Sequence, residues 1–88
     1  MSPRLIAELA ERYLEYSDAE VRDDAAISDA QGLYQEREAA IRAASSLARM
    51  QTYWRTLQTL LPMDDLVLLG KEIGRRRREA VLAEEATR

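Results

Sequence analysis

The sequence predicts an all-α fold of two to three long antiparallel helices, arranged as a helical hairpin or a small bundle. Apolar residues recur at three- and four-residue steps along most of the 88 residues. Glycine and proline together number only five, which leaves little material for turns or strands. The chain is 47% apolar, but 14 of its residues are alanine, so residues 1–88 are expected to form one domain with a thin core.

The first helix is expected over residues 3–16. Ser2 suits the N-cap position, and Pro3 suits the first helical position because its missing N–H would have no partner there anyway. The apolar side of this helix would be formed by Leu5, Ile6, Leu9, Tyr13, Leu14 and Tyr16. Residues 17–31 are expected to be either a short helix or a connector, because the runs 17–20 and 28–31 both have the pattern of a capping box.

The longest helix is expected over residues 33–61, after a bend at Gly32. Pro62 would end it, because the residue before a proline is disfavoured in the α region. Its predicted apolar row alternates three- and four-residue steps and is apolar at all positions but one: Leu33, Glu36, Ala40, Ala43, Leu47, Met50, Trp54, Leu57 and Leu61. A neighbouring row of Ala30, Tyr34, Ile41, Ala44 and Ala48 widens this face.

A third helix is expected over residues 64–83, with Asp64 and Asp65 in its first turn, where carboxylates interact favourably with the helix dipole. Acidic side chains near the C-terminal end interact unfavourably with the dipole, so residues 84–88 are expected to fray. The apolar face of this helix begins with Leu66, Leu69 and Ile73 and is interrupted by Gly70 and Gly74.

The composition argues against several classes of function. The chain has no cysteine and no histidine, so we expect no disulfide, no cofactor, no metal site and no Ser-His or Cys-His catalytic couple. We therefore expect that the protein is not an enzyme. No apolar run approaches the length of a membrane span, and the N-terminus lacks the apolar stretch of a signal peptide, so a cytoplasmic location is expected.

Charge is distributed unevenly along a chain whose net charge is −3. Residues 1–38 carry a net −6, residues 39–61 a net +3, and residues 62–88 are balanced. The acidic first third could therefore lie along basic helices, either within one chain or across a dimer.

Two clusters are the candidate partner-binding residues. The first is Met50, Tyr53, Trp54, Arg55 and Leu57, because Trp, Tyr and Arg dominate binding hot spots. Trp54 could equally be part of the core. The second cluster is the basic run Arg75, Arg76, Arg77 and Arg78, which would surround the helix and which either contacts an acidic partner or pairs with Glu72 and Glu79.

The function expected from these features is that of a small acidic protein–protein interaction module. It would act sterically as an inhibitor, an anti-activator or an assembly subunit, with a protein partner whose identity the sequence does not indicate. In size and style it is similar to small helical regulators encoded by phages and mobile elements. The alternative is a nucleic-acid-associated regulator that uses Arg42, Arg49, Arg55 and the run 75–78. An enzyme that works by electrostatics alone is a third hypothesis.

A homodimer is also expected, on the basis of helix length. A helix over residues 33–61 would be about 43 Å long, whereas one over residues 3–16 would cover only about half of it. Antiparallel pairing of residues 33–61 with a second copy would set the slim alanine half of one chain against the Met50–Leu57 half of the other.

Overall fold

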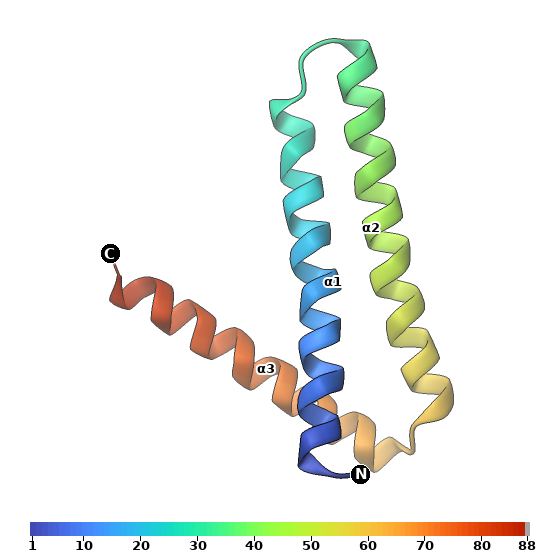
Figure 1. The fold of residues 1–88 in the computed structure, drawn as a ribbon, viewed down its shortest axis with the longest axis vertical. Helices are drawn as coiled ribbons and strands as arrows, with labels where there is room; N and C mark the ends of the chain where they lie inside the picture. The colour runs from blue at the N-terminus through green and yellow to red at the C-terminus, as the bar shows by residue number, and fades with distance from the viewer. Residues whose placement is uncertain (88) are drawn as a thin grey trace.

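The protein consists of three long helices and has no strands within residues 1–87, the part of the chain that the computed structural model describes. The helices are α1 (Pro3–Asp29), α2 (Leu33–Leu60) and α3 (Met63–Ala86). Helices α1 and α2 form an antiparallel hairpin, and α3 crosses its open end obliquely and continues beyond α1 (Figure 1). The predicted all-α class is confirmed.

Helix α1 begins as predicted but is almost twice as long as expected. The Ser2 hydroxyl oxygen accepts a hydrogen bond from the backbone N–H of Leu5 at 3.2 Å, and Pro3 is the first helical residue. The expected end at Tyr16 is wrong, because the helix continues to Asp29. Ser17 does not cap a new helix; it is buried and accepts a hydrogen bond from Arg77. The chain leaves the helix at Ala30, whose backbone is extended, and Gly32, with φ of +85°, completes the turn as the N-cap of α2.

Helix α2 has the expected bounds to within one residue, but only part of the predicted apolar row is buried. The buried residues are Ala39, Ala43, Ser46 and Leu57, again at helical steps. The N-terminal part of the predicted row is instead exposed, with Leu33 at 65% and Leu47 at 38%. The physical reason is that the Ser46 hydroxyl donates a hydrogen bond to Asp23, while small side chains let α1 approach closely on this side.

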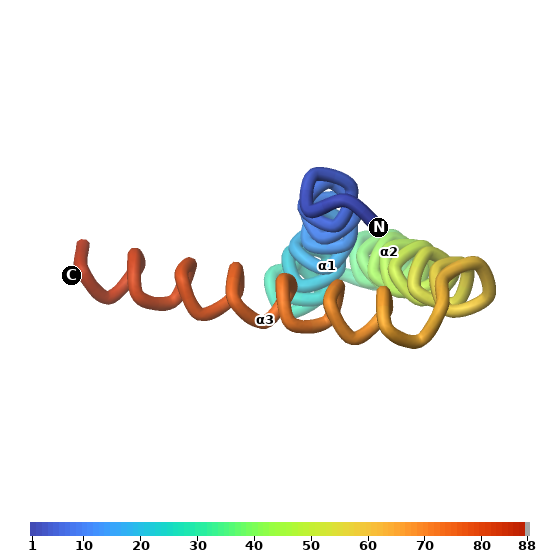
Figure 2. The backbone as a smooth tube through the Cα atoms, turned by 90° about the horizontal axis from the view of Figure 1, so that it is seen from below, coloured from blue at the N-terminus to red at the C-terminus, as the bar shows by residue number. Residues whose placement is uncertain are grey.

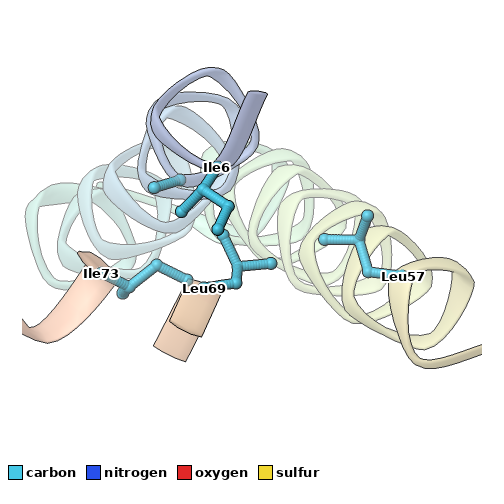
Figure 3. Packing of buried hydrophobic residues seen from close by; sticks show 5 residues of the cluster. Ile6, Leu57, Leu69 and Ile73 are labelled. Carbon is cyan, nitrogen blue, oxygen red and sulfur yellow. The ribbon is translucent and has the colours of Figure 1, made fainter. Parts of the chain in front are cut away.

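The core lies where the three helices meet, at the open end of the hairpin. It contains Ile6, Ala10, Leu57, Leu69 and Ile73, and Leu69 is completely buried (Figure 3). Helix α3 begins after Pro62 and runs slightly longer than predicted, to Ala86. The expected fraying of residues 84–88 is therefore not seen up to Ala86, and Arg88 lies outside the described residues.

The molecule is a flat V rather than a closed bundle, with Cα extents of 48 × 37 × 15 Å. The second half of α3 leaves the hairpin and has no helix beside it (Figure 2). Val81 and Leu82 on this half are 53% and 63% exposed. Within residues 1–87, none of the helices combines the length and apolarity needed to cross a bilayer.

The observed length of α1 removes the argument from which a homodimer was predicted. With 27 residues, α1 spans about 40 Å, close to the length of α2 with its 28 residues. The proposed pairing of the alanine half with the Met50–Leu57 half is also wrong, because Leu57 is buried inside its own chain. Dimerisation itself stays a prediction.

Candidate protein-binding site

The most site-like region is the angle where α3 leaves the hairpin, which we call the α3 notch. It contains two open hollows that share Arg77. The inner hollow, about 210 Å³, is lined by Tyr13, Trp54, Gly70, Ile73 and Arg77. The outer hollow, about 370 Å³, is lined by Arg77, Arg78, Val81, Leu82 and Glu85.

Arg77 connects the two hollows and attaches α3 to α1. Its guanidinium carbon lies 5.7 Å from the centroid of the Tyr13 ring, a cation–π distance. Its Nη2 donates a hydrogen bond to the Ser17 hydroxyl oxygen at 3.2 Å. Because both partners are on α1, Arg77 sets the direction in which α3 leaves the hairpin.

Trp54 forms the floor of the inner hollow. Its ring lies 5.5 Å from that of Tyr13, centroid to centroid, at an interplanar angle of 59°. Such tilted pairs are favourable because the positive ring edge meets the negative face. Trp54 is half-buried, so it belongs partly to the core and partly to the notch.

The first two arginines of the basic run are engaged on another side of α3. Arg75 Nε lies 2.6 Å from Glu72 Oε1, and Arg76 Nε lies 3.1 Å from Glu72 Oε2. Hydrogen bonds from these guanidinium groups lower the pKa of the Glu72 carboxyl to about 2, and the pKa of Arg75 is raised in turn. Arg78, in contrast, has no carboxylate of the described chain within ion-pairing distance.

The structure brings together only three of the predicted partner-binding residues, namely Trp54, Arg77 and Arg78. Leu57 is in the core, and Met50 is half-buried. Arg55 is exposed on a different face of α2 from Trp54, because successive residues of a helix are turned by about 100°.

Tyr53 is half-buried, and contacts with α1 hold it against the hairpin. Its hydroxyl donates to the Leu9 carbonyl oxygen at 3.4 Å, and its ring lies 5.2 Å from that of Tyr16. Burial raises the pKa of the Tyr53 hydroxyl above its ordinary value.

The sequence-based reasoning missed Tyr13, Val81 and Leu82 as members of the notch. Val81 and Leu82 are adjacent apolar residues in a segment rich in charge, and nothing in the sequence distinguishes them from an ordinary helix face. That no other helix lies beside them depends on the direction of α3, for which the sequence contains no signal.

The faces of α1 and α2 that α3 covers continue beyond it, uncovered. On α1, Val21 lies one turn after Ser17 and is 61% exposed. On α2, Leu47 lies two turns before Trp54 and is 38% exposed. Exposed Asp18 and Asp24 lie on either side of Val21 in the sequence. Beyond the notch, both α1 and α2 therefore have an exposed apolar residue on the face that α3 covers.

The described residues offer no group of three or more Asp or Glu side chains placed to hold a metal ion. Comparisons of the chain with protein-family models, curated proteins and solved structures found no match.

Proposed function

We propose that this protein is a non-enzymatic, protein-binding module that receives a segment of its partner in the α3 notch. The observation that carries the proposal is the exposure of Val81 and Leu82, at 53% and 63%, on a helical segment with no neighbour. Binding would act sterically, by covering a working surface of the partner. The protein would thus be an inhibitor, an anti-activator or an assembly subunit.

The energetics of the projecting segment support this proposal. Residues 77–86 form a helical arm about 15 Å long that is packed only at its base. Helices shorter than about 12–15 residues are marginally stable in water without tertiary packing. A partner that packs on the arm would therefore stabilise it, and part of the binding energy would be used to order it.

The chemistry of the notch favours an amphipathic partner helix with at least one carboxylate. Val81 and Leu82 offer apolar contact, while the guanidinium of Arg78, which pairs with no carboxylate within residues 1–87, lies beside them and can bind a carboxylate bidentately. Trp54 at the floor offers a flat apolar surface at the centre of the site.

A nucleic-acid partner has less support. Arg75 and Arg76 both pair with Glu72, so half of the basic run is already neutralised within α3. The other arginines of this alternative are all exposed but are divided between two helices, with Arg42, Arg49 and Arg55 on α2 and Arg77 and Arg78 on α3.

The test is affinity purification of the tagged full chain from its native host, with two matched variants. Leu82→Glu places a charge in the outer hollow at an exposed position, so the fold is retained. Met63→Glu is the control, because Met63 is 72% exposed at the other end of the same helix.

A specific protein that is recovered with the wild type and with Met63→Glu, but not with Leu82→Glu, would support the proposal. Recovery of no specific protein, or equal recovery with Leu82→Glu, would refute it. Material that is lost after nuclease treatment, and whose binding falls steeply with salt, would favour the nucleic-acid alternative instead.

A further inference from the structure

A second apolar surface lies on the outer side of α2, away from the notch. Tyr34, Ile41 and Leu33 are 74%, 65% and 65% exposed, and no part of the described chain covers them. Exposed alanines at positions 40, 44 and 48 continue the surface. Positions 34, 37, 41, 44 and 48 follow three- and four-residue steps, so they form one stripe, which we call the outer stripe of α2.

The outer stripe contains one charged residue in its first four turns, Arg37. Solvent-facing helix surfaces are ordinarily rich in charge, as on the other sides of this protein. An apolar stripe on one helix, about 22 Å long, has the dimensions of a helix–helix contact.

We propose that the outer stripe is the contact between two copies of this chain, in which α2 pairs antiparallel with α2 of the second copy. The two-fold axis of this dimer is perpendicular to the two helices and lies at the level between residues Arg42 and Ala43. In this register Ile41 lies opposite Ala44 of the second copy, and the aliphatic stem of Arg37 lies opposite Ala48. Each large side chain thus meets a small one, which is how helix interfaces interdigitate.

Charge complementarity indicates a second copy rather than an unrelated partner. Glu38 and Arg49 are both exposed and lie along the same border of the stripe. Antiparallel pairing about this axis brings Glu38 of one chain near Arg49 of the other, and symmetry produces the contact twice. Parallel pairing would instead leave Glu38 of one chain and Arg49 of the other about 16 Å apart along the helices, too far to form an ion pair.

This inference goes beyond the proposed function, because the outer stripe and the α3 notch are on different faces. A partner could therefore occupy the notch of each chain in the dimer, and Leu82→Glu is expected to leave dimerisation unchanged. The two proposals can fail independently of each other.

The oligomeric state is tested by sedimentation equilibrium of the full chain from 1 to about 500 µM. The contact is a single helix stripe about 22 Å long, which is small for a protein interface, so we expect a weak dimer that dissociates within this concentration range. The mass should therefore rise from 10.1 kDa towards about 20 kDa with concentration. A folded monomer at every concentration would overturn the proposal.

Two exposed positions on α2 provide the matched variants. Ile41→Glu, in the stripe, should raise the dissociation constant at least tenfold. Leu60→Glu should leave it unchanged, because Leu60 is 71% exposed but lies outside the stripe. Equal effects of the two substitutions would overturn the assignment of the contact to the outer stripe.

The register is tested by disulfide formation, which is simple here because the chain has no cysteine. Ile41→Cys mixed with affinity-tagged Ala44→Cys should form a disulfide between the two variants. Ala48→Cys alone should form no disulfide, because the two copies of position 48 in an antiparallel pair are about 16 Å apart along the helix direction. Rapid cross-linking of Ala48→Cys with itself would show parallel pairing and overturn the register.

Discussion

Leu69 is the side chain on which the attachment of α3 to the hairpin depends most. It is completely buried, and it packs among Ile6, Ala10, Leu57 and Ile73, which come from all three helices. Replacing a buried leucine by alanine costs about 3 kcal/mol or more when the cavity cannot collapse. A chain of this length has a free energy of unfolding of about 4–13 kcal/mol, and the thin core here places it in the lower part of that range. Leu69→Ala should therefore remove most of the stability.

The assay is thermal and urea unfolding followed by circular dichroism and by fluorescence of Trp54, the single tryptophan. A loss of 3 kcal/mol corresponds to a melting temperature lower by roughly 12–24 °C for a domain of this size. The fluorescence of Trp54 should change with the first loss of structure, because Trp54 packs against the same core. The matched control is Leu68→Ala, at a neighbouring position that is 47% exposed, which should cost less than about 1 kcal/mol. Equal effects of the two substitutions would refute the placement of Leu69 at the centre of the core.

Three further outcomes are expected. The pKa of Glu72 is about 2, below its ordinary value of 4.5, so its ion pairs stabilise the fold above pH 4.5 and this contribution is lost as the pH falls towards 2. NMR titration of Glu72 measures this pKa directly, and the free energy of unfolding of Glu72→Gln should depend less on pH in this range than that of the wild type. Arg77→Ala should destabilise the fold by about 1 kcal/mol in urea unfolding through the loss of its contacts with α1, whereas Arg78→Ala should have no measurable effect. Ser46→Ala should cost about 1–2 kcal/mol, because Asp23 is half-buried and would lose its hydrogen-bond donor; unfolding as stable as that of wild type would contradict the pairing.

The candidate site could be predicted only in part. Trp54, Arg77 and Arg78 were identified from residue type alone, since aromatic residues and arginine are typical of interfaces. The role of Arg77 could not be found in this way, because its hydrogen-bond partner Ser17 is 60 residues away. The same contact explains why the capping-box pattern at Ser17 was misleading. A serine that can begin a helix can also face inward in the middle of one, where another helix supplies its partner.

The sequence by itself determined the helical class and placed the two chain reversals near Gly32 and Pro62. Pro62 ends α2 through local backbone geometry, and Gly32 is the N-cap residue of α2, with a φ of +85° that glycine adopts without strain. Only the tertiary structure decided which side of α2 is buried and where α3 points. A helix presents residues in every direction, and the buried side of α2 includes Ala39 and Ser46, which belong to neither predicted apolar row. Contacts with α1 decided this side, through the hydrogen bond between Asp23 and Ser46 and the close packing at Ala39 and Ala43.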